Sequence, residues 1–114
     1  MTSHRSLLEK LYAAFNARDI EAVLLRLHDD VRWANGMSGG VVQGHAALRE
    51  HWASQWRRTD SWITPLQFVE LPDGRMAVEV HQLIRDLAGA ILKDGKVRHL
   101  YRIEGGGVRE MAIG

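Results

Sequence analysis

The first third of the chain repeats hydrophobic residues at the spacing of a helix. The residues that share one helical face are Leu7, Leu8, Leu11, Tyr12 and Phe15. Ser6 followed by Glu9 has the pattern of an N-terminal capping box, and Thr2 or Ser3 offers an earlier start. The pattern therefore predicts an amphipathic helix whose apolar face packs against a core.

A second, shorter hydrophobic stripe follows Asp19, a candidate N-cap residue. The stripe consists of Ile20, Val23, Leu24 and Leu27. We expect this helix to stop near 28–30 and a brief strand to occupy 31–34. Residues 35–44 hold four glycines and an Asn-Gly pair, which indicates a flexible loop.

The remaining chain predicts one more helix and then a run of strands. Over about 46–58, Leu48, Trp52 and Trp56 lie four residues apart on one helical face. From Ser61 onward the hydrophobic period falls from 3.6 to 2. The predicted strands are 62–71, 75–86, 91–104 and 108–113. Strands joined by such short turns are antiparallel, so we predict an α+β protein whose three N-terminal helices cover one face of a curved sheet.

Composition and charge narrow the classes of function. The 114 residues are 46% hydrophobic with a net charge of +1, which fits a single domain over 1–114 and argues against nucleic-acid or anionic-membrane binding. The lack of cysteine excludes disulfides, thiolate catalysis and zinc–cysteine sites. No apolar run reaches the roughly 20 residues of a membrane span, and the start lacks the apolar core of a signal peptide. We therefore expect a cytoplasmic protein.

Four segments together resemble a known superfamily. They are LYAAFNARDI at 11–20, LHDDVRW at 27–33, GHAAL at 44–48 and HLYRI at 99–103. In this order, and followed by a glycine turn and a short strand, they resemble the nuclear transport factor 2-like superfamily in its SnoaL-like, ketosteroid-isomerase-related bacterial branch. The resemblance covers nearly the whole chain.

The resemblance implies a cone-shaped fold with a pocket for a small apolar molecule. Its three N-terminal helices would pack in the concavity of a strongly curved, mostly antiparallel sheet, with the pocket at the open end. Relatives are commonly homodimers joined through the outer sheet face, and they include cofactor-free isomerases, dehydratases and cyclases as well as non-catalytic modules. Fold alone therefore does not give function.

The residues that the steroid isomerases use are changed in this chain. Those enzymes use a carboxylate base, a tyrosine and a protonated aspartate. The matching motifs place Asn35 at the base, Leu11 at the tyrosine, one residue before Tyr12, and His99 at the second carboxyl. An amide cannot accept the proton, so the resemblance supports the pocket but not isomerase chemistry of the usual kind.

His99 is the main candidate for catalysis. Strand alternation places Val97, His99, Tyr101 and Ile103 on one face, and Trp33 with Asn35 on one face of the first strand. Imidazole titrates near neutral pH, and burial beside aromatic residues would tend to lower the pKa of His99. His99 could therefore act as a general acid or base while Asn35 orients a carbonyl or hydroxyl. The alternative is a hydrogen-bonded core histidine without a catalytic role.

His81 allows a second catalytic interpretation. Scytalone dehydratases share the fold and use two histidines from neighbouring strands, which would require a bulge near 93–95 to turn His81 into the pocket. Against this, Val78 and Val80 favour the core, which sends His81 outward with Glu79 and makes Gln82 the inward polar residue. Both interpretations remain open at the level of sequence.

The tryptophan-rich composition bears on the pocket, since the chain has four tryptophans against two tyrosines and two phenylalanines. The predicted ligand-contacting residues are Tyr12, Phe15, Trp33, Met37, Trp52, Trp56, Gln82 and Tyr101. Trp52 and Trp56 have a core-packing alternative, and the Met37 segment is either a lid or an ordinary surface loop. Potential ligands lack the spacing of a metal site, so we predict neither a metal nor a cofactor.

Two classes of function follow from the sequence. One is a cofactor-free isomerase, dehydratase or cyclase in which His99 moves a proton on a small apolar molecule. The other is a non-catalytic module for ligand binding or dimerisation. In either class we expect a homodimer through the outer sheet face, where Arg98, Leu100 and Arg102 alternate and could pair with Glu79.

Overall fold

The computed structural model describes residues 3–36 and 39–114, which form helices and strands in the order of an α+β fold. Within these ranges the elements are α1 (His4–Asn16), α2 (Ile20–Leu24), β1 (Leu27–Ala34), β2 (Val41–Gln43), α3 (His45–Arg58), β3 (Thr59–Glu70), β4 (Met76–Asp86), β5 (Ile91–Glu104) and β6 (Gly107–Ile113). The strands make one sheet in the order β2-β1-β6-β5-β4-β3. The β1–β6 pair is parallel and the other pairs are antiparallel.

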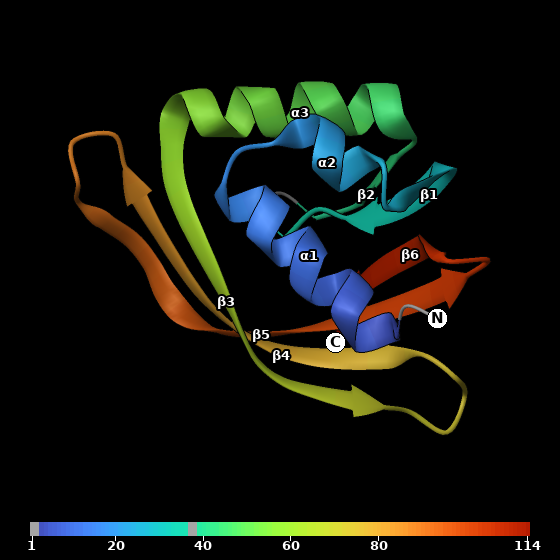
Figure 1. Cartoon of the computed structure of the whole chain (residues 1–114). Helices are drawn as coiled ribbons and strands as arrows, with labels where there is room; N and C mark the ends of the chain where they lie inside the picture. Colours follow the sequence, from blue (N-terminus) through green and yellow to red (C-terminus); the bar gives the residue numbers. More distant parts are fainter. Residues whose placement is uncertain (1–2, 37–38) are drawn as a thin grey trace.

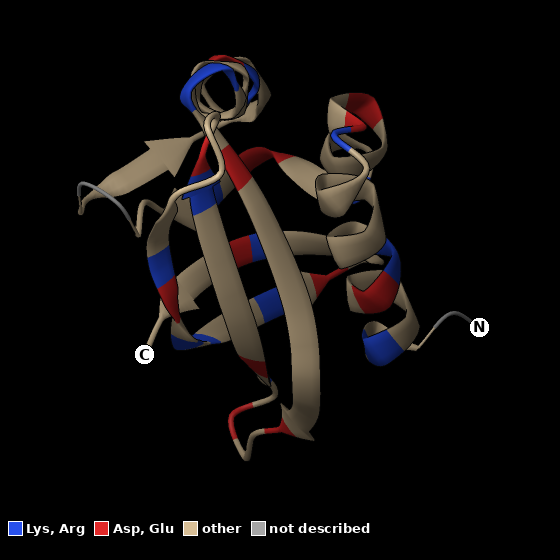
Figure 2. Ribbon diagram, turned by 90° about the vertical axis from the view of Figure 1, so that its left-hand side faces the viewer, with Lys and Arg blue, Asp and Glu red and all other residues tan. Residues whose placement is uncertain are grey.

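The sheet bends around the helices, as the sequence predicts. In Figure 1, β3, β4 and β5 sweep from beneath α1 up to the level of α3, with the helices on the concave side. Figure 2 shows α3 end-on above the strands and α1 with α2 beside them. Register shifts between Pro65 and Gln67 and between Ile84 and Arg85 mark irregularities in the long strands. Such bulges bend and twist a strand locally, which helps the sheet to curve.

The two first helices begin at side-chain caps. Ser3 accepts a hydrogen bond from the Ser6 backbone N–H at 3.0 Å, so α1 takes the earlier of the predicted starts. Asp19 accepts one from the Ala22 N–H at 3.2 Å, which confirms the predicted cap of α2. The buried face of α1 includes Leu11 and Tyr12, so the predicted stripe does reach the core.

The predicted boundaries around β1 and β2 were wrong. The second helix ends at Leu24 instead of near 28–30, because Leu27 already pairs with Val108 of β6 in the parallel ladder. The predicted loop over 35–44 contains β2, which pairs antiparallel with β1 at the sheet edge. Both errors arise because pairing with distant strands decides the conformation of short segments.

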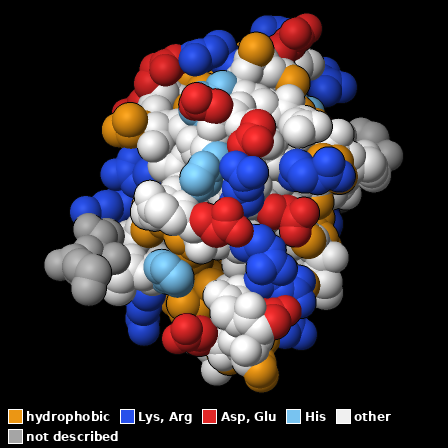
Figure 3. Space-filling view, turned by 90° about the vertical axis from the view of Figure 1, so that its right-hand side faces the viewer, with side chains coloured by type: hydrophobic (Ala, Val, Ile, Leu, Met, Phe, Trp, Pro, Cys, Tyr) orange, Lys and Arg blue, Asp and Glu red, His pale blue; other side chains and the backbone are white. Residues whose placement is uncertain are grey.

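Charged side chains of both signs mix on the surface. Arg109 lies 2.9 Å from Asp30 and 3.8 Å from Glu104, and Arg32 lies 3.9 Å from Glu110. Figure 3 shows this mixing on the face that lies to the right in Figure 1. Exposed pairs of this kind contribute about 0–1 kcal/mol each, so the fold depends on its apolar core. No helix among the described residues is long and apolar enough to cross a membrane.

Candidate functional site

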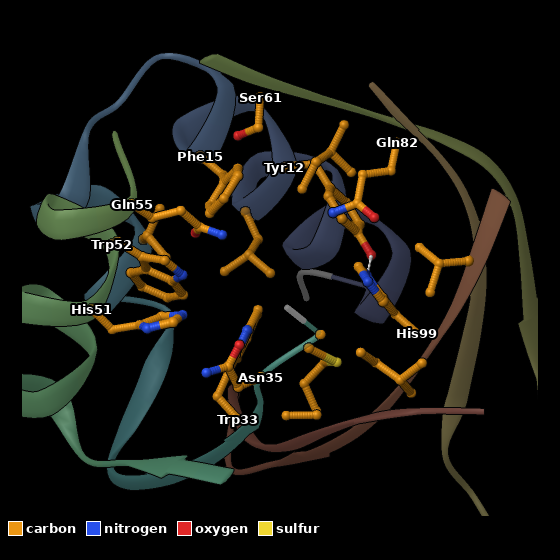
Figure 4. A pocket seen from close by; sticks show the side chains of 18 of the residues that line it. Tyr12, Phe15, Trp33, Asn35, His51, Trp52, Gln55, Ser61, Gln82 and His99 are labelled. Atoms are coloured by element: carbon orange, nitrogen blue, oxygen red, sulfur yellow. Dashed lines mark hydrogen bonds between the residues drawn. The ribbon is translucent and has the colours of Figure 1, made fainter. Parts of the chain in front are cut away.

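A cavity of about 150 Å³ lies between the helices and the concave face of the sheet. Its described lining is Leu11, Tyr12, Phe15, Val23, Trp33, Ala34, Asn35, Gly36, His51, Trp52, Gln55, Ser61, Ile63, Gln82, Ile84, Lys93, Val97, His99, Tyr101, Met111 and Ile113. Figure 4 shows the α3 side chains facing Tyr12 and His99 across this space. Residues far apart in the chain therefore meet at one small, mainly apolar site.

A chain of three hydrogen-bonding side chains forms one wall of the cavity. The Tyr101 hydroxyl donates to the Tyr12 hydroxyl at 2.7 Å. Tyr12 in turn lies 2.9 Å from Nδ1 of His99. All three side chains are buried, with His99 6% exposed, so the network is shielded from water. Hydrogen bonds in such surroundings are strong, and an unmade one is costly.

Burial sets the protonation states of this network. Burial first, and the nearby Lys93 charge second, lower the pKa of His99 to about 4. Burial also raises the pKa of Tyr12 and of Tyr101. At neutral pH the imidazole is therefore neutral and both phenols keep their protons. The Tyr12 hydroxyl accepts from Tyr101, so its own hydrogen is available to Nδ1 of His99. When that bond is made, the hydrogen of the neutral ring is on Nε2.

Aromatic rings supply the apolar part of the wall. Trp33 meets Trp52 edge-to-face with ring centroids 5.4 Å apart, and Phe15 meets Trp52 at 5.8 Å. Trp33 also meets Tyr101 at 6.1 Å, which connects the tryptophans to the hydrogen-bonded chain. Edge-to-face contacts of this kind hold rings in fixed orientations. The aromatic wall is therefore a preformed surface.

Polar groups outside the Tyr12–His99 network also face the cavity. His51 lies on α3, and its pKa is lowered by partial burial and then by the charge of Arg58. Ser61 is 4% exposed, and its hydroxyl has no hydrogen-bond partner among the described residues. Gln82 and Lys93 approach from β4 and β5. The wall thus offers several hydrogen-bonding groups to a bound molecule.

The predicted site residues fall into three groups. Those that line the cavity are Tyr12, Phe15, Trp33, Asn35, Trp52, Gln82, His99 and Tyr101. Met37 lies outside the described residues. His81 and Trp56 are not among the described lining residues, and the packing around each side chain explains its absence from the cavity wall.

His81 points to the outer face of the sheet. Its Nε2 lies 2.6 Å from the Asp94 carboxylate, and both side chains are partly exposed. Val78 and Val80 are fully buried, so the alternation of β4 turns Gln82 inward and His81 outward. The arrangement with two histidines on neighbouring strands facing one pocket is therefore not present.

Trp56 packs behind the cavity wall, although it was predicted to contact a ligand. Its ring stacks on Trp52 with centroids 6.4 Å apart and meets Phe15 at 5.3 Å. The guanidinium of Arg18 lies 5.5 Å from the Trp56 ring centroid. These neighbours occupy the ring, so Trp56 takes the core-packing alternative and supports Trp52 from behind.

The sequence interpretation missed four polar lining residues, although two signals were present. His51 and Gln55 flank the predicted Trp52–Trp56 face of the helix, so a wider stripe would have included them. Lys93 shares the period-2 face of His99 on β5, and Ser61 shares that of Ile63 on β3. Which of these faces bounds empty space, however, depends on the curvature of the sheet.

The described residues contain no group of three or more His, Cys, Asp or Glu side chains that could hold a metal ion.

Comparisons with known proteins identify the family of the chain and agree with its fold. The family model for the SnoaL-like domain matches residues 8–111. An NTF2-like protein of unknown function from Burkholderia pseudomallei is 26% identical with a TM-score of 0.85, covering 100% of this chain and 91% of that one. TerC, crystallised with polyporic acid, is 28% identical with a TM-score of 0.81, covering 95% and 87%.

A third similar structure is an uncharacterised cystatin-fold protein from Novosphingobium aromaticivorans. It is 20% identical with a TM-score of 0.80, and the match covers 95% of this chain and 94% of that one. At this identity the likeness shows the fold alone. A search of curated proteins finds no match to the chain.

Proposed function

The chain belongs to the SnoaL-like domain family, and from that premise we propose that its cavity binds a small, mainly apolar organic molecule and performs cofactor-free acid–base chemistry on it. The cavity of about 150 Å³ has the size that holds one benzene-like ring in a protein interior. The related TerC was crystallised with an organic molecule, polyporic acid, which supports a ligand of this general kind. The reaction would be of the isomerase, dehydratase or cyclase type.

The observation that carries this proposal is the buried hydrogen-bonded network of the Tyr101, Tyr12 and His99 side chains. Because Tyr12 donates to Nδ1, the neutral imidazole presents Nε2–H as a donor. A donor held in place and shielded from water stabilises an oxygen that gains negative charge, without having to reorganise during the reaction. His99 would thus polarise a carbonyl or hydroxyl of the bound molecule.

The proton that leaves carbon needs an acceptor. His51 faces the same cavity from α3, and its lowered pKa leaves its imidazole neutral at pH 7, with a ring nitrogen that can accept a proton. Asn35, on the cavity wall beside Trp33, would orient the substrate oxygen. We assign His99 to the oxygen of the substrate, His51 to the carbon-bound hydrogen and Asn35 to positioning.

A specific observation favours a second candidate, a binding module without catalysis. With its pKa at about 4, His99 carries no extra proton to donate at neutral pH, and the described cavity lining holds no carboxylate base. A site of this kind binds a ring well and needs no turnover. The two candidates differ in whether a bound ketone exchanges its α-hydrogens.

The test uses cyclohexanone, a one-ring ketone, in D2O with proton NMR detection. Under the enzyme proposal the protein accelerates exchange of the α-hydrogens, and His99→Asn or His51→Gln lowers that acceleration by about tenfold or more. His81→Asn is the matched control, since His81 lies on the outer face. Exchange no faster than in buffer, with cyclohexanone bound, would assign the cavity to the non-catalytic candidate.

We also propose that two copies associate through the outer face of the sheet. Trp62 is 56% exposed there, and Leu83 is its partner in the neighbouring strand. Glu79, which was expected to pair with arginines of this face, has its ammonium partner in Lys96 at 3.6 Å, while Arg98 lies opposite Glu79 in the ladder. An exposed apolar surface with a mixed charged border has the composition of a protein interface.

A further inference from the structure

The charged groups of the described cavity wall are of one sign, positive. Among the described residues that line it there is no aspartate or glutamate, whereas Lys93 contributes an ammonium group. The two histidines of the wall have lowered pKa values and are neutral at pH 7. A ligand in this cavity therefore meets one positive charge and no negative charge.

Nearby carboxylates that could neutralise Lys93 are engaged elsewhere. Asp94, the next residue, pairs with His81 on the outer face. Asp60 pairs with Arg18 at 2.7 Å, and the Asp86 carboxylate accepts hydrogen bonds from two backbone N–H groups of its own turn. Within the described part of the chain, no hydrogen bond or ion pair involves the Lys93 ammonium.

A buried hydroxyl without a partner lies in the same row of the sheet. Ser61 of β3 pairs with Ile84 of β4, and Ile84 pairs with Lys93 of β5, so the three residues lie side by side across three strands. Ser61 is 4% exposed, and its hydroxyl has no partner among the described residues. A buried donor of this kind costs free energy until an acceptor satisfies it.

Gln82 extends this polar corner toward the middle of the cavity. Its ladder partner is Ile63, two residues beyond Ser61 on β3, so Gln82 occupies the next inward-facing row. Figure 4 shows Ser61 and Gln82 on the same side of the cavity, across from Trp33 and Asn35. Its amide supplies a further N–H donor to an oxygen placed near Ser61.

We propose that Lys93, Ser61 and Gln82 form a carboxylate-binding corner, so that the cavity selects an organic acid with a single apolar ring. The inference rests on the proposed binding of a small ring, and it adds the charge of that molecule. The ring lies against the aromatic wall while the carboxylate accepts hydrogen bonds from the ammonium, the hydroxyl and the amide. Hydrogen bonds to a charged group are stronger than those between neutral groups, so the acid is preferred over its amide.

The test compares phenylacetate with phenylacetamide, which has nearly the same shape and no charge, by isothermal titration calorimetry. We expect the protein to bind phenylacetate about tenfold more tightly. Lys93→Met removes the charge but keeps the apolar stem, and should weaken phenylacetate binding by about tenfold while leaving phenylacetamide unchanged. Added salt should weaken the binding of phenylacetate and leave that of phenylacetamide unchanged, because Lys93 is exposed and dissolved ions screen an exposed charge.

Two further variants make the result specific. Lys96→Met is the matched control, because Lys96 lies on the same strand and has its ion pair with Glu79. It should leave the binding of both probes unchanged. Ser61→Ala should weaken phenylacetate about threefold without lowering the melting temperature, since the hydroxyl has no partner among the described residues.

The outcomes separate this inference from the function on which it rests. Equal affinity for acid and amide, or equal losses in Lys93→Met and Lys96→Met, would overturn the carboxylate corner and leave ring binding in place. Binding of neither probe would overturn both proposals.

Discussion

At the scale of single residues, His99 illustrates how burial changes the meaning of a side chain. Its pKa falls from 6.5 to about 4 because the imidazole is desolvated and Lys93 is near. The sequence predicts the direction of this shift, because it places His99 beside aromatic residues on an inward strand face. In the fold it is a neutral group within hydrogen-bond distance of the Tyr12 hydroxyl, so its chemistry depends on a residue 87 positions away.

The lowered pKa of His99 predicts a pH dependence of stability. Below pH 6.5 the unfolded chain binds a proton at His99 that the folded chain does not, so the free energy of unfolding falls as the pH drops from about 6.5 to about 4. The contribution lost over this window is roughly 3 kcal/mol. Urea unfolding at pH 7 and pH 4.5 should show a smaller loss in His99→Asn than in the natural protein, and parallel losses would contradict the prediction.

At the scale of elements, one side chain attaches the end of α1 to β3. The Asn16 amide donates to the Ile63 carbonyl at 2.7 Å and accepts from the Ile63 N–H at 2.9 Å. The Asn16 side chain thereby makes the two hydrogen bonds with the backbone of Ile63 that a neighbouring strand would otherwise make. This contact holds β3, and with it Ser61 and Ile63 of the cavity wall, against the helix.

We predict that Asn16→Ala lowers the free energy of unfolding by about 2–3 kcal/mol, because it leaves the N–H and C=O of Ile63 without partners in a partly buried place. Hydrogen exchange at the Ile63 amide should accelerate as well. Gln67→Ala, at an exposed position of the same strand, is the control and should cost less than about 0.5 kcal/mol. An Asn16 variant as stable as the control would show that the contact contributes little.

At the scale of the whole molecule, the sheet has two faces with different roles. The concave face bounds the cavity and the core, whereas the outer face carries the exposed Trp62 and the His81–Asp94 and Lys96–Glu79 pairs. One alternation of side chains produces both faces. A change of register by one residue would therefore exchange the cavity wall for the outer surface.

The proposed dimer predicts a mass twice that of the chain in sedimentation velocity at micromolar concentration. Trp62→Lys places a charge on the outer face and should shift the protein to a monomer that remains folded. Leu25→Lys is the control, since Leu25 is 82% exposed at the end of α2, and should remain dimeric. A monomer in the unsubstituted protein would contradict the proposal.

The family, the α+β architecture and most element positions could be predicted because they depend on local order in the sequence. The periodicity of Leu11 and Tyr12 marked a buried helical face, Asp19 marked a cap, and the alternation along Val97, His99 and Tyr101 marked an inward strand face. The same alternation separated Gln82 from His81, although the sequence alone left both interpretations open. Each of these signals is carried by residues that are near one another in the chain.

Only the tertiary structure decided which groups meet. Tyr12 and His99 come from distant segments and lie 2.9 Å apart, and Ser61, Ile84 and Lys93 come from three strands and lie in one row. Residues 27–30, expected to end a helix, form a strand because they lie beside the distant strand β6. The physical reason is that periodicity defines the face of an element, whereas sheet curvature and register define what lies opposite that face. The sequence by itself thus determined which face of each helix and strand is apolar, and the tertiary structure determined which polar groups meet in the cavity between those faces.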